Sequence, residues 1–413
     1  MAIITDHLRP RSSNRTKAAA AAAATITSPA AMTEPQSKIS ARDFYGEYYG
    51  HRVQHLKQLL PLLRSTTATA TATTSSATTT ASSPNPIAST SQESCIIWTA
   101  GDSSLDNKYW FSDTAPAIGA YADLLQPPRS KQDVTYWLNR TLQDRQQALT
   151  QKQIGPRTTA INAAVEATTL NERTFKLRPQ DEFLRDNIQP QDILVVSVGG
   201  NDVALSPLPC TVCAIGGLLC FLPAACMEYG CTVATVPADD CCCGCGPSLC
   251  SCAAACPPCL GYLRHMFGTR CQNYIQALTA KTKPAKILVC MIYYPDENTS
   301  PSWAGPALGA LGYNQNPAKL QTLIRKAHVE AVCRIRIPGS TVISVPLYHV
   351  LDGKNTDDYV QRVEPSPAGG RKMAEFLLDL MEQHVEENQG VASHYGSIAT
   401  SAAPLSPFMQ GRG

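Results

Sequence analysis

The chain has 413 residues, a net charge of +2 and only 16% charged residues. It is long enough for one large domain with insertions or for two domains. It has no basic stripe and no interleaved aromatic pattern, which are the usual sequence features of a nucleic-acid-binding protein, so we do not expect a protein of that class. Its unusual feature is 17 cysteines. Thirteen of them fall between Cys210 and Cys259, which indicates one local cysteine-rich segment rather than a disulfide framework along the whole chain.

The N-terminal segment, residues 1–42, is rich in Ala, Ser and Thr and shows little apolar periodicity. Basic residues precede a run of seven alanines, Ala18–Ala24, and no acidic residue lies between Asp6 and Glu34. A basic, acid-poor composition is typical of an organelle transit peptide. A disordered tail has the same composition, and we favour that interpretation.

Residues 43–64 carry apolar side chains at helical spacing, which predicts an amphipathic helix. Pro61, in the last turn, is expected to kink or end that helix. Residues 65–92 are a charge-free Ser/Thr/Ala stretch that can bury too little surface to order itself, so we predict a linker or surface loop. The apolar positions of the predicted helix are Val53, Leu56, Leu59, Leu60 and Leu63.

Five short apolar stretches are predicted strands, and segments with helical periodicity separate them. Continuous apolar strands belong to a parallel sheet that is covered on both faces. Strands that alternate with helices are joined by right-handed crossovers. We therefore predict one three-layer α/β domain over residues 93–388, followed by a disordered tail at 389–413. The predicted strands are Cys95–Trp98, Arg157–Thr169, Asp192–Val198, Lys286–Tyr293 and Thr341–Leu347.

The main predicted helices lie between these strands and after the last one. The final helix has the clearest start, because Ser366 is a good N-cap and Pro367 is well suited to the first helical position. The other predicted helices are a short one around Val134–Leu138, then Asp181–Ile188, Gly268–Lys281 and Ala318–Ile335.

Gly101-Asp102-Ser103 follows the first predicted strand. When an apolar strand ends at a Gly and a Ser follows, the Ser hydroxyl lies at the carboxyl end of the sheet, where α/β folds bind ligands. By itself the pattern is also typical of a turn or a helix cap. Two further polar blocks end the second and third strands, Asn162–Thr169 and Gly199-Gly200-Asn201-Asp202.

Together these blocks resemble the SGNH, or GDSL-type, esterase/lipase superfamily over about residues 95–388. The resemblance implies a five-stranded parallel sheet of flavodoxin-like type, the SGNH hydrolase fold, and an acyl-enzyme formed on Ser103. It also implies that Asn201 donates its side-chain amide to the oxyanion. Ala167 stands where the family has its oxyanion-hole Gly, and its backbone N–H can serve equally if its φ is allowed.

The last block departs from the family pattern. The family has Asp-x-x-His-Pro-Ser before the final helix, whereas this chain has Gln361 and Glu364 in the Asp and His places. A Ser hydroxyl is a poor nucleophile without a base, and Glu is a weak base unless burial raises its pKa. Three hypotheses follow. Glu364 is the base, or His349 or His265 enters the site, or the site binds without catalysis.

We accordingly predict a serine-dependent carboxylic-ester hydrolase that acts on a small-molecule ester or acylated substrate. The alternative is a non-catalytic binding protein on the same fold. The resemblance implies no cofactor and no metal at this site, and no nucleic acid is expected as a partner. The helix that follows Glu364 would lower the pKa of this acid, whereas burial under the Cys-rich insertion would raise it.

The Cys-rich insertion covers residues 206–263. Two Cys-x-x-Cys pairs, starting at Cys210 and Cys256, have spacing that would suit two zinc sites. The clustered thiols also resemble a small oxidised module, although the odd total of 17 leaves at least one unpaired. Residues 203–227 are uncharged and long enough for a membrane span, but prolines and glycines interrupt them. We favour disulfides over zinc and zinc over a span, and expect an apolar lid or a loop that contacts a membrane surface.

Overall fold

The computed structural model describes residues 38–65, 94–148, 158–207 and 260–388, together with five residues between 211 and 219. The hypotheses of zinc, disulfides or a lid in the Cys-rich insertion depend on residues outside this set. The same holds for the expectations on the N-terminal segment, the linker and the C-terminal tail. Four cysteines lie in the described part, and all four are free thiols: Cys95, Cys271, Cys290 and Cys333.

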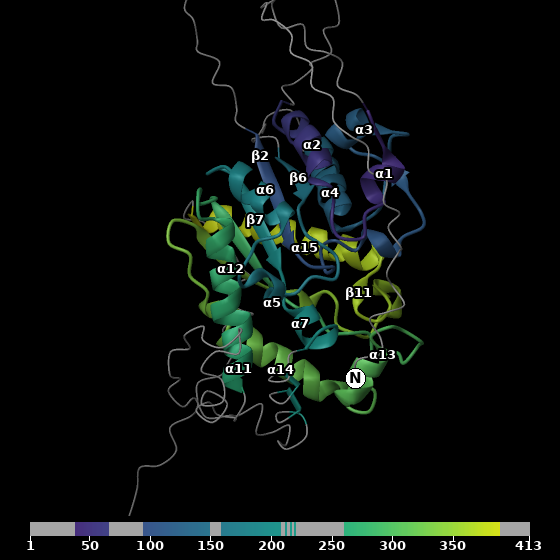
Figure 1. Cartoon of the computed structure of the whole chain (residues 1–413), viewed down its shortest axis with the longest axis vertical. Coiled ribbons are helices and arrows are strands. Elements are labelled where there is room, and N and C mark those ends of the chain that lie inside the picture. The colour runs from purple at the N-terminus through teal and green to yellow at the C-terminus, as the bar shows by residue number, and fades with distance from the viewer. Residues whose placement is uncertain are drawn as a thin grey trace, which may run out of the picture. The chain divides into compact units, whose positions relative to one another are not determined.

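A five-stranded parallel sheet forms the centre of the described part (Figure 1). Its spatial order is β6-β2-β7-β8-β9, so β2, the first of these five strands in the chain, lies between the second and the third. This is the 2-1-3-4-5 order of flavodoxin-like sheets, and it confirms the predicted fold class. The strands are β2 (Cys95–Gly101), β6 (Thr158–Asn162), β7 (Ile193–Ser197), β8 (Lys286–Met291) and β9 (Thr341–Pro346).

Helices cover both faces of the sheet, as continuous apolar strands require. Alternate residues of each strand enter different cores: Trp98 of β2 packs in one apolar cluster and its neighbour Ile97 in the other. The first face is covered by α2 (Val53–Ser65), α6 (Pro179–Asn187), α12 (Cys271–Leu278) and α14 (Pro317–Glu330), and the second by α4 (Val134–Ala148) and α15 (Pro367–Asn388) (Figure 1).

Shorter elements connect these layers. Two-stranded pairs are formed by β1 (Ile39–Ser40) with β4 (Leu125–Gln126), β3 (Ala115–Pro116) with β5 (Arg129–Ser130), and β10 (Tyr359–Val360) with β11 (Glu364–Pro365). The short helices and helical turns are α1 (Ala41–Tyr45), α3 (Ala120–Leu124), α5 (Leu170–Arg173), α7 (Gly200–Ala204), α11 (Leu260–Arg264), α13 (Gly305–Ala310), η1 (Lys108–Trp110), η2 (His265–Arg270), η3 (Val332–Arg334), η4 (Leu347–His349) and η5 (Thr356–Asp358).

The prediction of a single helix over residues 43–64 is wrong. The structure has α1 and α2 with a connection between them, in which Gly50 adopts a φ of 75°, a conformation that Gly reaches without strain. The α2 helix continues past Pro61 to Ser65. Its Arg64 guanidinium donates to the Asp192 carboxylate at 2.7 Å, beside the start of β7. This stretch therefore packs on the sheet rather than standing apart from it.

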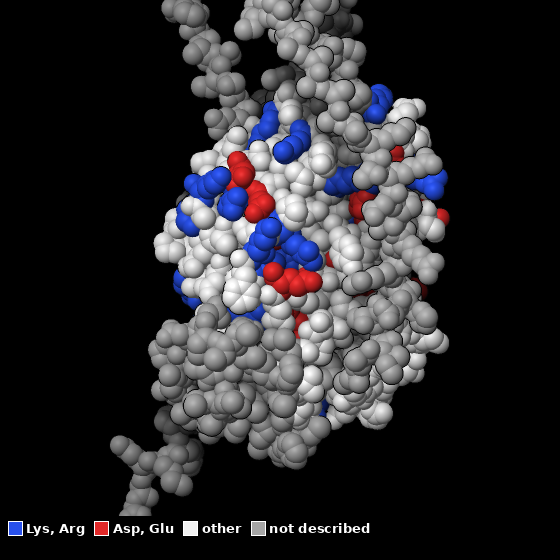
Figure 2. Space-filling model, viewed as in Figure 1, with Lys and Arg blue, Asp and Glu red and all other residues white. Residues whose placement is uncertain are grey.

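The surface in Figure 2 carries acidic and basic side chains side by side on the described part of this face. Some ion pairs of the described residues lie within one helix, as that of Arg140 with Asp144 in α4 does. Within the described residues, none of the helices combines the length and apolar character needed to cross a bilayer.

Candidate active site

Ser103 lies at the carboxyl end of β2, where the chain turns sharply against β7. Gly101 makes this turn possible with a φ of 128°, and a Cβ at this position would lie only 1.8 Å from the carbonyl oxygen of Ser197. The backbone N–H of Asp102 donates to the same carbonyl at 3.0 Å. The turn leaves the Ser103 side chain 6% exposed at the edge of the sheet, where the sequence predicted it.

Glu364 is the hydrogen-bond partner of Ser103. The Ser103 hydroxyl donates to Glu364 Oε1 at 3.2 Å, although 261 positions separate the two residues in the sequence. Glu364 begins β11, and the preceding turn contains Gln361 and Arg362 at positive φ. Ser366 then caps α15 by accepting the N–H of Gly369 at 3.2 Å. The Pro-Ser motif thus places Glu364 just before a helix N-terminus, as predicted.

Burial dominates the electrostatics of Glu364. The side chain is 3% exposed, and desolvation raises its pKa to about 8. The nearby Asp102 and Asp106 carboxylates raise this pKa further, whereas the Ser103 hydrogen bond lowers it. The second oxygen, Oε2, has no hydrogen-bond partner among the described residues. Burial therefore outweighs the helix end, and Glu364 has the proton affinity of a base that works in mildly alkaline solution.

The residue in the place of the family's Asp and the two alternative bases lie in other elements: Gln361 precedes β11, His349 ends η4 and His265 begins η2. Gln361, in the place of the family's Asp, accepts the backbone N–H of Trp303 at 3.0 Å and so has its own partner. His349 is exposed, and its ring contacts Tyr348 at a centroid distance of 4.8 Å. His265 is buried in η2, which packs against α12, α14 and η3. The base hypothesis thus depends on Glu364.

The second and third blocks contact each other at the ends of β6 and β7. Ala167 has a φ of 54°, the left-handed conformation that Gly adopts most easily, so an Ala takes the backbone shape expected at this place. The Asn201 amide donates to the carbonyl of Thr168 at 3.0 Å, so it lies beside the residue that follows Ala167. The Asp202 carboxylate accepts two backbone N–H groups at the start of α5. These bonds hold Asn201 and Ala167 as neighbours.

A buried arginine, which the sequence did not single out, joins the first block to the second. The Arg173 guanidinium donates to the carbonyl of Gly101 at 2.8 Å and to Thr168 Oγ1 at 2.6 Å. Its Nε donates to Asp181 at 3.0 Å, which balances the buried charge. Arg173 thus fixes the turn before Ser103 relative to the segment that contains Ala167.

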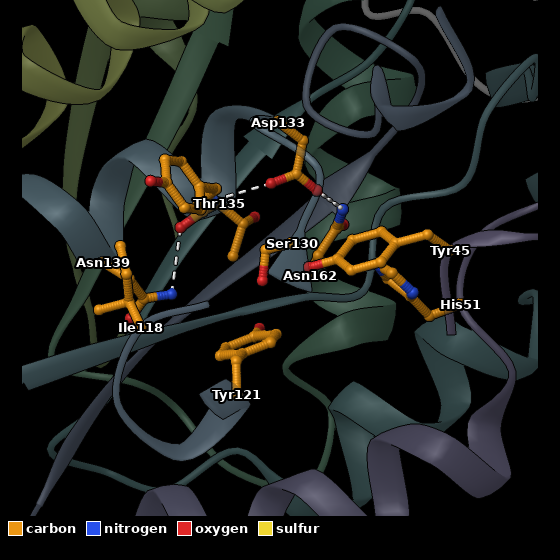
Figure 3. Close-up of a pocket in the computed structure, with 10 residues that line it drawn as sticks. Tyr45, His51, Ile118, Tyr121, Ser130, Asp133, Thr135, Asn139 and Asn162 are labelled. Atoms are coloured by element: carbon orange, nitrogen blue, oxygen red, sulfur yellow. Dashed lines mark hydrogen bonds between the residues drawn. The ribbon is translucent and has the colours of Figure 1, made fainter. Parts of the chain in front are cut away.

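A second group of buried charges lies beside the site, and we call it the Asp106 cluster. The Lys108 ammonium donates to both oxygens of Asp106 at 2.6 Å, and both side chains are fully buried. The Asn162 amide donates to Asp106 at 3.0 Å and to Asp133 at 3.2 Å. Figure 3 shows Asn162 pointing at Asp133 beside a small polar pocket, which Tyr45, Ser130 and Tyr121 also line.

This cluster is the one place in the described residues where metal-ligand atoms gather. Atoms of His51, Asp106 and Asp133 lie within 4.8 Å of one another. The Lys108 ammonium already supplies a positive charge to Asp106, and Asn162 donates to both carboxylates. A metal ion would have to displace these donors, so we assign the cluster to the protein's internal packing rather than to a metal.

Neither a protein-family model nor a curated protein matches the sequence. Solved structures do resemble the fold, and they are SGNH-type esterases and lipases at low identity. A carbohydrate esterase of family 3 from Talaromyces cellulolyticus is 10% identical, with a TM-score of 0.30 over 71% of this chain and 99% of that chain. A lipase/acylhydrolase from Enterococcus faecalis is 11% identical, with a TM-score of 0.32 over 70% and 96%. The acetylxylan esterase Axe2 from Geobacillus stearothermophilus is 14% identical, with a TM-score of 0.33 over 69% and 92%. Such values assign no activity and no site residue to this chain.

Proposed function

We propose that this protein is a serine-dependent carboxylic-ester hydrolase in which Ser103 is the nucleophile and Glu364 the general base. One observation carries the proposal, the hydrogen bond between two buried side chains that come from opposite ends of the domain. A buried carboxyl beside the hydroxyl of a strand-end serine has the geometry that proton abstraction requires.

In the proposed reaction, Ser103 Oγ attacks the ester carbonyl while its proton passes to Glu364 Oε1. The carbonyl oxygen becomes negative, and the backbone N–H groups of Ser103 and Ala167 and the Asn201 amide stabilise it. Each such donor lowers a barrier of this kind by about 3–4 kcal/mol. The carbon–oxygen bond to the alcohol then breaks, and the alcohol takes the proton from Glu364. Water releases the acyl group from Ser103 by the same steps, with Glu364 again accepting the proton.

A binding protein on the same fold is the second candidate. The observation in its favour is that Glu364, with a pKa of about 8, is mostly protonated at neutral pH and then cannot accept the Ser103 proton. The two functions therefore differ in their pH dependence. The hydrolase gains activity as the pH rises through about 8, whereas the binding protein stays inactive throughout.

The test combines a fluorophosphonate probe with hydrolysis of a p-nitrophenyl ester from neutral to alkaline pH. We expect the probe to label the wild type and not Ser103→Ala. The matched control is Ser104→Ala, which removes the adjacent hydroxyl and should still be labelled. Glu364→Gln should lose about 10²–10⁴-fold in kcat with the fold intact.

Labelling of Ser103→Ala would refute the nucleophile, and full activity of Glu364→Gln would refute the base. The variant Glu364→His separates the two functions, because it restores a conventional base. If the wild type is inert and only Glu364→His hydrolyses the ester, the natural protein binds its ligand without cleaving it.

A further inference from the structure

Glu166 is a second buried acid beside the proposed catalytic site. It lies in the loop after β6, directly before Ala167, and only 1% of it is exposed. The Trp110 indole N–H donates to Glu166 Oε1 at 3.1 Å, while Oε2 has no hydrogen-bond partner among the described residues. A buried acid with one unpartnered oxygen is unusual, because burying such an oxygen costs free energy unless it gains a hydrogen-bond partner or a proton.

Residues of one loop, 102–110, form hydrogen bonds with Glu166 and with the Glu364-Pro365 segment. Toward Glu364, Ser103 donates to its carboxyl, and the Asn107 amide donates to the carbonyl of the next residue, Pro365, at 2.7 Å. Toward Glu166, the Asp106 carboxylate accepts its backbone N–H at 3.1 Å, and Trp110 donates to its side chain. The two acids are thus fixed by the same nine residues and form what we call the glutamate pair.

The electrostatics of the glutamate pair agree with this placement. Burial is the first cause that raises the pKa of Glu166, to about 10, and the charge of Glu364 is the second. The phenol of Tyr48 is close enough to both acids for each to raise its pKa. Two neighbouring buried carboxyls cannot both ionise easily, so the last proton of such a pair is held strongly.

Other charges around the pair do not replace that proton. The charge of the buried Lys108 lowers the pKa of Glu166, but its ammonium is already bonded to both oxygens of Asp106. The phenols of Tyr48 and Tyr293 have pKa values raised by burial, so they stay neutral. The titratable groups that face the pair are Asp102, Asp106, Lys108, Lys131, Tyr48 and Tyr293.

We propose that Glu166 is a positioning residue that keeps its proton while Glu364 is ionised and donates it to the free Oε2 of Glu364. The Glu364 carboxylate is then held on both sides, by the Ser103 hydroxyl at Oε1 and by the Glu166 acid at Oε2. A neutral acid thus orients the base, and both unpartnered oxygens take part in one hydrogen bond.

The rate consequences of this inference rest on the proposed function. Below a pH of about 8, Glu364 is protonated and cannot act as the base. Above about 10, Glu166 loses its proton, so that it no longer donates and instead repels Glu364. The pH profile of kcat should therefore be bell-shaped, with its two limbs belonging to the pair as a unit.

The first test compares Glu166→Gln with Glu166→Leu. The Gln side chain keeps an N–H donor but cannot ionise, so it should keep most of the rate and lose the alkaline limb. The Leu side chain cannot donate, so its kcat should fall by about tenfold or more, and its acid limb should move to higher pH. Glu172→Gln is the matched control, because it neutralises an exposed glutamate of α5 and should leave the profile unchanged.

An alkaline limb that persists in Glu166→Gln, or equal rates for the Gln and Leu variants, would overturn the proposal. A second measurement needs no activity and no variant that folds poorly. Infrared spectroscopy of the wild type with labelled glutamate, between pH about 8 and about 10, should show one protonated buried carboxyl. If that band is missing, Glu166 holds no proton. If the band is present and Ser103 is unreactive, the pair stands and the hydrolase proposal fails.

Discussion

The Asp106 cluster and the glutamate pair both involve the loop of residues 102–110, and they differ in how many of their carboxyl oxygens have hydrogen-bond donors. In the Asp106 cluster all four carboxylate oxygens have donors, among them the Lys108 ammonium and the Asn162 amide. In the glutamate pair each acid has one oxygen without a partner. Burial raises the pKa of Asp133 in the cluster to about 7, and it raises the pKa values of Glu364 and Glu166 to about 8 and about 10. We infer that the donors of the satisfied cluster stabilise the fold, whereas the unsatisfied pair holds its protons more strongly.

The largest effect expected from this comparison is on stability. Lys108→Met should lower the free energy of unfolding by about 3–5 kcal/mol, because it leaves the Asp106 carboxylate buried without its cation. The control is Lys281→Met, which removes an exposed pair with Asp186 and should change stability by only about 0–1 kcal/mol. Urea denaturation measures both. If the two variants lose equal free energies of unfolding, the Asp106 cluster does not stabilise the fold more than an exposed ion pair does.

The next effect is on how the stability of the fold depends on pH. Folded Glu364 has a pKa of about 8, above its ordinary value of 4.5, so the folded protein holds a proton that the unfolded chain releases. Its contribution to stability is therefore complete below about pH 4.5 and is lost as the pH rises toward about 8. Glu364→Gln removes this dependence and should gain on the order of a few kcal/mol relative to wild type on the alkaline side.

Urea midpoints of wild type and Glu364→Gln at a mildly acidic and a mildly alkaline pH check this prediction. The difference between the two proteins should be larger at the alkaline pH. Parallel curves would show that Glu364 titrates as it would in water, and the contrast between the two groups of carboxyls would then be lost.

The sequence predicted the sheet because its signals are local. The strands β7 and β8 are almost continuous apolar runs, and Gly101-Asp102-Ser103 and Pro365-Ser366 mark a strand end and a helix start within a few residues. These signals place Ser103 and Glu364 correctly relative to the sheet. The sequence could not show that burial decides the pKa of Glu364, because the groups that bury it come from distant segments.

The sequence missed Glu166, Lys108 and Arg173 for a related reason. A charged residue in a sequence resembles a surface residue unless its partner is known, and the partner of Arg173 at Gly101 lies 72 positions away. The break between α1 and α2 did have a local signal, the glycines at positions 46 and 50, but the apolar spacing of residues 43–64 outweighed it. Buried charge is therefore the property that required the structure.

The smallest effect concerns the turn that directs the glutamate pair. Ala167 follows Glu166 and has a φ of 54°, a conformation that costs an L-residue about 1–2 kcal/mol. Ala167→Gly removes this strain, although the freer unfolded chain offsets part of the gain, so stability should change by about 1 kcal/mol or less. The backbone N–H is kept, so the proposed oxyanion donor remains and kcat should fall by less than about tenfold.

Ala167→Val is the contrasting variant, because a β-branched side chain tolerates positive φ poorly and should destabilise the turn. Thermal unfolding and kcat of both variants, measured beside Glu166→Gln, would show whether the turn matters through its N–H or through the direction it gives to Glu166. A loss of the alkaline limb in Ala167→Gly, with its N–H still present, would assign the effect to Glu166.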